Sequence, residues 1–224
     1  MPTPFVPFGA AHLAALGVVC VLAAGLVALV RARPGAALPV RVLLAVAIAS
    51  LDGFELWTAA REGWLGWQTV LPFELCDAAM VLAVVTLVFP RQRPAEVVYF
   101  WACSGSILAM LTPDLRWSFP RWEFVVFFGL HGLVLAAALV LVFGLGLRPR
   151  PGAPLRVLGL TAAWTAFVGL VDRGLGTNFM YLREKPPVTT PLDWMGPWPV
   201  YIVVAAVVAL ASFELLALPF RRER

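Results

Sequence analysis

Seven long apolar runs constrain this chain more than any other feature of its sequence. Each run has about 20 residues, the length that an α-helix needs to cross the hydrocarbon core of a bilayer. Of the 224 residues 61% are hydrophobic and only 13% are charged, which is more apolar than a soluble domain of this size requires. The predicted fold class is all-α: a polytopic membrane protein with seven transmembrane helices in one bundle, a single domain over residues 1–224.

The limits of the seven spans follow from charged residues and from breaks rich in proline and glycine. The predicted helices lie near residues 11–30, 38–60, 71–89, 95–111, 122–147, 155–171 and 198–220. The sixth predicted helix is short, and glycine-rich sequence follows it. The sequence shows no internal repeat of the kind found in many transporters.

The distribution of basic residues predicts the direction of the chain. With the N-terminus outside, six of the 17 Lys and Arg residues lie in outer segments, each with an acidic residue nearby. The other eleven lie in cytoplasmic segments: Arg31, Arg33, Arg41, Arg91, Arg93, Arg148, Arg150, Arg156, Arg221, Arg222 and Arg224. The positive-inside rule therefore predicts an outer N-terminus, a cytoplasmic C-terminus and a multi-pass protein of the cell membrane. Because these membrane-flanking arginines account for the net charge of +4, no nucleic-acid partner is predicted.

Polar side chains from several spans fall at a similar depth, in the outer third of the membrane. A helical rise of about 1.5 Å per residue gives this depth for an acidic pair in the second span, a polar triplet in the third and a histidine in the fifth. They are Asp52, Glu55, Glu74, Cys76, Asp77 and His131. An intramembrane acid costs about 2.5–3.5 kcal/mol at the bilayer centre and less near the interface. Either these groups share a cavity or, for Glu74 and Glu55 in particular, interfacial carboxylates reach up to water.

A thiol, an imidazole and nearby carboxylates form a residue set suited to nucleophilic acyl chemistry. The predicted roles are Cys76 as nucleophile, His131 as general base, and Asp77 or Asp52 as the acid that orients the imidazole. Two plainer interpretations stay open. Cys76 is also consistent with a small buried hydrophobe, and His131 with a hydrogen-bonded interior residue.

Several cofactor-dependent classes are not favoured by the composition. A retinal protein needs a lysine within a helix, and the only lysine, Lys185, lies in a loop. Zinc enzymes commonly use three nitrogen or sulfur ligands, whereas the chain has two histidines; a site built from His131, Cys76 and a carboxylate stays open. His12 is interpreted as an interfacial residue at the start of the first helix. The sequence thus predicts no metal, no cofactor and no disulfide framework.

Three stretches carry a resemblance to a known family: LPFELCD in the third span, LTPDL with FPRWEFVVFFGLHG through the fifth, and NFMYLREKPPVTTPLDWMGPWPVYI before the seventh. They resemble the YwaF family of bacterial integral membrane proteins. That family is similar to a vertebrate multi-pass phospholipid acyltransferase that places polyunsaturated chains on ether lipids with a cysteine nucleophile and a histidine. The resemblance implies that Cys76 and His131 take these roles. The chain departs from the family pattern at Glu74, where the family has a histidine.

The long segment before the seventh span supplies three further candidates. Asn178, Tyr181 and Arg183 are expected just above the cavity as supporting or substrate-binding residues. Because the planar guanidinium fork of arginine suits carboxylates and phosphates alike, Arg183 is expected to pair with a carboxylate of the layer or with a lipid phosphate. A solvated loop arginine is the plainer alternative.

Two functions of different classes are consistent with this sequence. The first is an intramembrane acyltransferase or lipid hydrolase whose substrate is a phospholipid or acyl-lipid. The alternative is a non-enzymatic carrier or binding protein, in which the same carboxylates bind a cation, a proton or a small polar ligand. A membrane scaffold with a structural polar network is a third reading.

Overall fold

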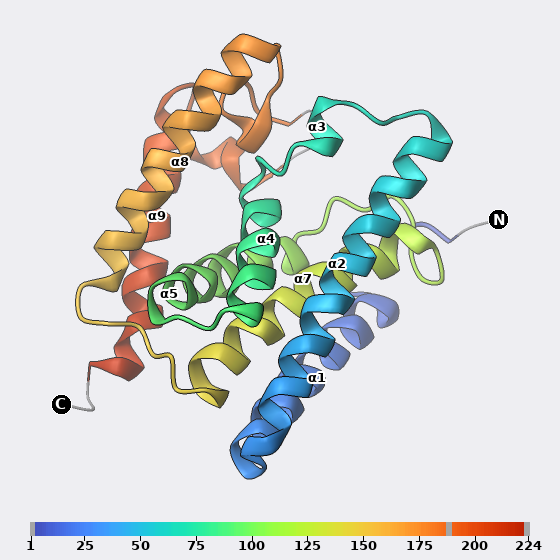
Figure 1. Cartoon of the computed structure of the whole chain (residues 1–224). Helices are drawn as coiled ribbons and strands as arrows, with labels where there is room; N and C mark the ends of the chain where they lie inside the picture. Colours follow the sequence, from blue (N-terminus) through green and yellow to red (C-terminus); the bar gives the residue numbers. More distant parts are fainter. Residues whose placement is uncertain (1–2, 187–189, 222–224) are drawn as a thin grey trace.

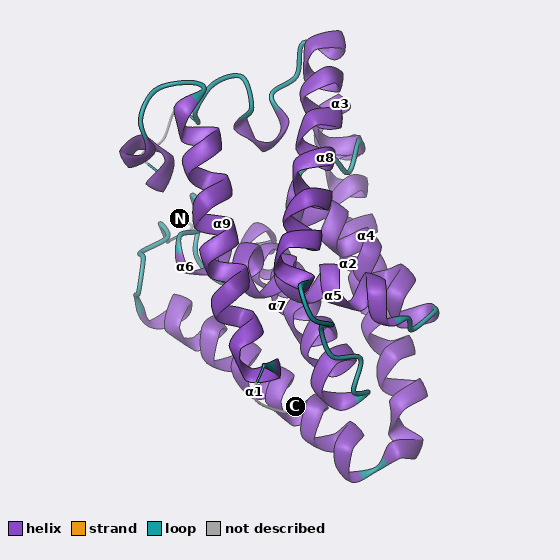
Figure 2. Ribbon diagram, turned by 90° about the vertical axis from the view of Figure 1, so that its left-hand side faces the viewer, coloured by secondary structure: helices purple, strands orange, loops and turns teal. Residues whose placement is uncertain are grey.

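The protein is an all-helical bundle. A computed structural model describes residues 3–186 and 190–221, and every regular element in these ranges is a helix, with one isolated β-bridge between Pro4 and Trp117 (Figure 2). Seven helices or helix pairs are long and apolar enough to cross a membrane. The predicted fold class and the number of spans are therefore confirmed.

Four spans are uninterrupted: α1 (Ala10–Ala32), α2 (Ala37–Glu62), α8 (Ala153–Leu175) and α9 (Val200–Ala217). The sixth span, predicted to end at residue 171, continues to Leu175, where Gly176 follows it with a φ of +71°. A left-handed glycine at this position lets the chain turn away while the last carbonyls stay hydrogen-bonded. The sixth span therefore ends at Leu175, before Gly176, and not at residue 171 as predicted.

The third span is broken where the sequence predicts a continuous helix over residues 71–89. It consists of α3 (Trp67–Val70) and α4 (Leu75–Val88), with extended backbone at Leu71 and at Glu74, which is the N-cap of α4. Pro72 lies within the break, and proline removes a backbone N–H that a helix interior needs. Cys76 and Asp77 consequently lie in the first turn of a new helix.

The fourth and fifth spans each change their helical pitch. The fourth consists of α5 (Gln92–Trp101), a π-helical segment (Ala102–Ser106) and α6 (Ile107–Leu111). The fifth consists of α7 (Trp122–Leu139) and a second π-helical segment (Val140–Gly144), so it ends before the predicted residue 147. In a π-helical segment each backbone hydrogen bond spans five residues instead of four, so the helix is wider there.

The centre of the bundle is α7, which packs against α1, α2, α4 and α5 (Figure 1). Ala136, Ala137 and Ala138 in its last turn are fully buried. The packing of α1 on α7 is close, because a Cβ atom at Gly132 would lie 2.5 Å from Cγ2 of Val19. Small residues at such crossings allow helices to approach each other in a membrane.

The last two spans form a pair at one side of the bundle. Figure 1 shows α8 and α9 running next to each other, apart from α1 and α2. Their outer surfaces carry exposed apolar side chains, among them Leu170, Val203 and Leu215. Surfaces of this kind are expected to face lipid.

Because the chain crosses the bundle seven times, the segments between spans alternate between its two ends. One end holds residues 3–9, 63–66, 112–121, 176–186 and 190–199; we call it the carboxylate end, because α2 brings Glu55 and α4 brings Asp77 to it. The opposite end holds the arginine-rich segments. Of the basic residues counted for orientation, Arg222 and Arg224 lie outside the described residues. The orientation of the termini across the membrane stays a prediction.

Candidate functional site

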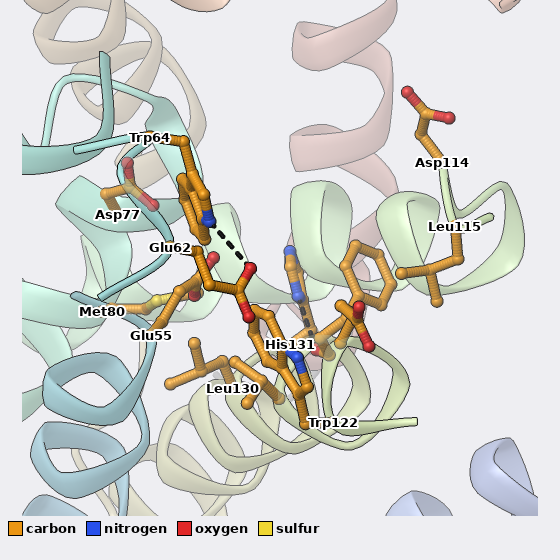
Figure 3. A pocket seen from close by; sticks show the side chains of 13 residues that line it. Glu55, Glu62, Trp64, Asp77, Met80, Asp114, Leu115, Trp122, Leu130 and His131 are labelled. Atoms are coloured by element: carbon orange, nitrogen blue, oxygen red, sulfur yellow. Dashed lines mark hydrogen bonds between the residues drawn. The ribbon is translucent and has the colours of Figure 1, made fainter. Parts of the chain in front are cut away.

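A cavity of about 450 Å³ opens at the carboxylate end, between α2, α4 and α7 (Figure 3). Carboxylates from three elements and the loop before α7 face it, together with two tryptophans, one histidine and apolar side chains. Its lining comprises Glu55, Glu62, Trp64, Asp77, Met80, Asp114, Leu115, Trp122, Glu123, Val126, Phe127, Leu130 and His131. The expectation that polar groups of separate helices meet in one space holds for Glu55, Asp77 and His131.

A second cavity of about 390 Å³ adjoins the first, between α2 and the broken third span. Glu55, Trp64 and Asp77 line both cavities and therefore form the wall between them. Asp52 and Glu74 line only the second. The carboxylate of Asp77 lies within electrostatic range of Glu74, Glu55 and Asp52, and the free N–H groups at the start of α4 favour negative charge at this position.

His131 presents one ring nitrogen to the first cavity. Its Nδ1 lies 2.8 Å from the carbonyl oxygen of Phe127, one turn earlier in α7. A carbonyl only accepts, so Nδ1 carries the proton and Nε2 of the neutral ring keeps its lone pair. Within the described residues Nε2 has no hydrogen-bond partner. The group that orients the imidazole is thus a backbone carbonyl, whereas the sequence predicts Asp77 or Asp52 for this role.

Cys76 is placed differently from its neighbour Asp77. It is half-buried, it packs against the hydrophobic core, and it is not among the residues that line the two cavities. Within the described part of the chain no hydrogen bond joins its thiol to His131. The structure therefore brings Asp77 and His131 together and leaves Cys76 behind the cavity wall, because a residue one position earlier in α4 points about 100° away.

Glu74 has a structural partner that the sequence does not reveal. Its carboxylate accepts a hydrogen bond of 2.9 Å from the backbone N–H of Met180, 106 positions later. Met180 and Tyr181 both have a φ of +53°, a conformation that residues other than glycine adopt only when their surroundings hold it. Glu74 therefore fixes the loop after α8 to the start of α4.

The loop residues Asn178 and Tyr181 are not among the residues that line the two acidic cavities. The side chain of Asn178 closes its own loop, accepting from the backbone N–H groups of Arg183 and Glu184 and donating to the carbonyl of Glu184. Partial burial, with the carboxylates of Glu74 and Asp114 nearby, raises the pKa of Tyr181. Its phenol thus lies between a residue of the second cavity and a residue of the first.

Arg183 does not pair with a carboxylate in the described part of the chain. Its Nη1 donates to the backbone carbonyl of Thr177 at 3.1 Å, and its side chain lines a groove between α8 and α9 instead of the acidic cavities. The expected pairing with an acid of the layer is therefore not found, whereas the pairing with a lipid phosphate stays open.

Sequence reasoning missed several residues of the first cavity. Glu62, Asp114 and Glu123 are acidic residues of the segments predicted to lie outside, and all three line it together with Trp64 and Trp122. The available signal was their position at the same end of the bundle as Asp77. Asp172, expected at the end of the sixth span, is fully buried, and one of its oxygens accepts from the Thr177 hydroxyl and the Phe179 N–H.

His12 is a buried residue rather than an interfacial one. Only 1% of its surface is exposed, because its ring packs among Phe5, Phe8 and Phe128. It bonds to the N–H of Phe8 and to the carbonyl of Met110. Among the described residues no three His, Cys, Asp or Glu side chains lie close enough together to hold a metal ion.

Seven helices long and apolar enough to cross a membrane, three of which border an acid-lined cavity, are typical of a multi-pass integral membrane protein. Residues 7–217 match the TMEM164 family, and the chain belongs to this family. It is 33% identical over 226 residues to a protein of Treponema pallidum (strain Nichols) described as an uncharacterized protein, and the alignment covers 97% of this chain and 90% of that protein. No solved structure matches the chain. The narrower resemblance to YwaF proteins stays a prediction.

Proposed function

We propose that this protein is an intramembrane acyltransferase or lipid hydrolase that acts on phospholipids of the cell membrane. The observation that carries the proposal is the hydrogen bonding of His131. Its Nδ1–H donates to the carbonyl of Phe127, and its free Nε2 faces the cavity of about 450 Å³ at the carboxylate end of the bundle. A neutral imidazole with a free nitrogen in a substrate-sized space is suited to act as a general base.

The proposed reaction uses Cys76 as the nucleophile. Nε2 of His131 takes the thiol proton, and the thiolate attacks the carbonyl carbon of an acyl ester. The tetrahedral intermediate collapses to a thioester, and the departing lysolipid oxygen receives the proton from Nε2. A hydroxyl of the acceptor lipid, or water, then gives its proton to Nε2 and attacks the thioester carbonyl. The new ester or fatty acid forms, and the departing thiolate takes the proton back from Nε2. Transfer to a lipid or to water distinguishes a transferase from a hydrolase.

The carboxylate of Asp77 assists this cycle through its charge. The imidazole becomes a cation each time it accepts a proton, and an anion lining the same cavity stabilises that cation. In this proposal a rotation of the first turn of α4, smaller than the about 100° between successive residues, brings the thiol to the edge of the cavity while Asp77 still borders it. The break before Glu74 leaves this turn attached to a short extended segment instead of a rigid helix.

The test is covalent labelling in lipid nanodiscs with a thiol-reactive probe that carries a long acyl chain. A background with Cys20→Ala and Cys103→Ala leaves Cys76 as the only thiol. We expect labelling of Cys76 and a loss of about 10²-fold or more in its rate in His131→Gln, because general-base catalysis contributes this much. Imidazole added to His131→Ala is expected to restore part of the rate.

The control is a variant that keeps Cys76 and His131 but loses a thiol elsewhere, such as Cys20→Ala alone, which should label like the wild type. Equal labelling rates in the wild type and in His131→Gln would contradict the proposal. Absence of labelling in wild-type nanodiscs, with Cys76 reactive only after unfolding, would contradict it as well.

A second function is favoured by one observation, namely that carboxylates and not the thiol line the cavities. A carrier or binding protein would use Asp77, Glu55 and Asp52 to hold a cation or a proton. Asp77→Asn would then abolish ligand binding whereas Cys76→Ala would not. If Cys76→Ala abolishes lipid turnover, the result supports the acyltransferase or hydrolase and contradicts the carrier.

A further inference from the structure

A third hollow of the molecule lies away from the acidic cavities, between α8 and α9. It is a groove of about 400 Å³ formed by α8, by the loop that follows α8 and by the first turn of α9. Its lining comprises Thr165, Gly169, Arg173, Leu182, Arg183, Trp198 and Ile202. It shares no lining residue with either acidic cavity.

Two guanidinium groups line this groove without a carboxylate among its lining residues. The guanidinium of Arg173, on α8, makes no hydrogen bond and no ion pair within the described part of the chain. Arg183 uses Nη1 for the carbonyl of Thr177, which leaves the remaining donors of its fork available. Two like charges beside one groove repel each other unless an anion lies between them, and a phosphate accepts such forks in a bidentate manner.

The remaining wall of the groove is apolar apart from Thr165. Gly169 leaves space on α8, because a Cβ atom added there would lie 3.8 Å from Cδ1 of Leu182. The indole of Trp198 donates to the carbonyl of Leu182 at 2.9 Å, which holds the loop over α9. Neighbouring Leu170 and Val203 are exposed on the outer surface of the same two helices.

We propose that this groove is a phospholipid-binding site. Arg173 and Arg183 bind the phosphodiester, and an acyl chain lies along Gly169, Leu182 and Ile202. A ligand with an anion at one end and a hydrocarbon chain at the other matches both the two guanidinium groups and the apolar side chains of the groove. The site does not depend on Cys76 or His131, so it stands or falls separately from the proposed acyl transfer.

The test is native mass spectrometry of the full chain in detergent, titrated with phosphatidylglycerol. We expect one retained lipid in the wild type and an affinity lower by about tenfold or more in the double variant Arg173→Gln/Arg183→Gln, since two charge-assisted contacts are lost. Gly169→Leu keeps both charges, fills the groove and improves helix propensity, and we expect it to lower the affinity as well.

The matched control is Arg61→Gln/Arg116→Gln, which removes two arginines from the same end of the bundle, where they lie over Trp57 and Trp117. It should bind as the wild type does. Unchanged binding in Arg173→Gln/Arg183→Gln, with wild-type elution on size exclusion, would overturn the proposal. If diacylglycerol, which lacks the phosphate, is retained as well as phosphatidylglycerol, the groove binds acyl chains alone and the proposal is overturned. If inorganic phosphate at equal concentration displaces the lipid, the groove is a site for free phosphate and the proposal is overturned as well.

Discussion

The two histidines of the chain differ in how many ring nitrogens are hydrogen-bonded. In His12 the Phe8 N–H donates to Nδ1, so this nitrogen carries no proton and Nε2–H donates to the carbonyl of Met110 at 2.8 Å. In His131 only Nδ1 is engaged. His12 therefore acts as a fixed connector between the N-terminal segment and α6, whereas His131 keeps a nitrogen for chemistry.

This difference predicts a structural effect for His12. His12→Phe preserves an aromatic ring among Phe5, Phe8 and Phe128, but it removes the partner of the buried Met110 carbonyl and of the partly buried Phe8 N–H. The expected loss is about 1–3 kcal/mol in the free energy of unfolding, measured by thermal or denaturant unfolding in detergent. Phe8→Leu removes a ring contact and retains the backbone N–H, so it should cost less. Equal losses in both variants would assign the stability to ring packing.

At the scale of helices, the closest packing in the bundle is where α1 crosses α7. Val19 fills the space that the absent side chain of Gly132 leaves, at 2.5 Å from the position of a Cβ atom. Because the β-branched side chain of Val19 has little freedom about χ1 in a helix, the two helices must move apart to accept a methyl group. A glycine that weakens a soluble helix thus determines how closely two membrane helices approach.

Gly132→Ala is expected to destabilise the protein by about 1–3 kcal/mol, the usual cost of overpacking. The measurement is the unfolding midpoint in detergent. The double variant Val19→Ala/Gly132→Ala should recover much of the loss, because the smaller side chain makes room. Gly25→Ala on α1 has no neighbour within 4 Å of the added Cβ and should be neutral. A Gly132→Ala protein as stable as the wild type would show that α1 and α7 are free to separate.

A second connection between elements lies at the arginine-rich end. The carboxylate of Glu96 on α5 is 3% exposed and accepts from the backbone and side chain of Arg150 and from Arg156 on α8. The same carboxylate raises the pKa of Arg150. This network fixes the start of α8 to the central helices, which otherwise contact the α8–α9 pair through few residues.

Glu96→Ala is therefore expected to cost about 1–3 kcal/mol of unfolding free energy, because charged donors lose a buried acceptor. The matched control is Glu123→Ala, which removes a more exposed ion pair with Arg121 and should cost about 0–1 kcal/mol. Both are measured as changes in unfolding midpoint. If the two variants lose the same stability, burial of the Glu96 network contributes nothing.

At the scale of the whole molecule, charge is segregated between the two ends of the bundle. The acidic cavities lie at one end and the Glu96–Arg150–Arg156 network at the other. In addition, the carboxylate end is itself divided, with acids between α2, α4 and α7 and with Arg173 and Arg183 beside α9. A phospholipid headgroup approaching this end meets both signs of charge.

The basic residues predict that the carboxylate end faces the outside of the cell. Gly66→Cys at this end and Gly35→Cys at the other form a matched pair, since both glycines are exposed with no neighbour near an added Cβ. In a variant that lacks the three native cysteines, a membrane-impermeant maleimide should label Gly66→Cys in intact cells and Gly35→Cys only after permeabilisation. The reverse pattern would place the N-terminus in the cytoplasm.

The sequence by itself determined the helical class, the seven spans and the depth of the polar side chains, because hydrophobic length and helical rise are local properties. It could not locate the bond from Glu74 to Met180 or the burial of His12, since each depends on a partner distant in the chain. The break at Pro72, in contrast, follows from proline chemistry that the sequence already carries. Only the tertiary structure decided that Asp77 and His131 share a cavity while Cys76 packs behind it. Depth along a helix is read from residue numbers, whereas the direction of a side chain around the helix is set by its neighbours.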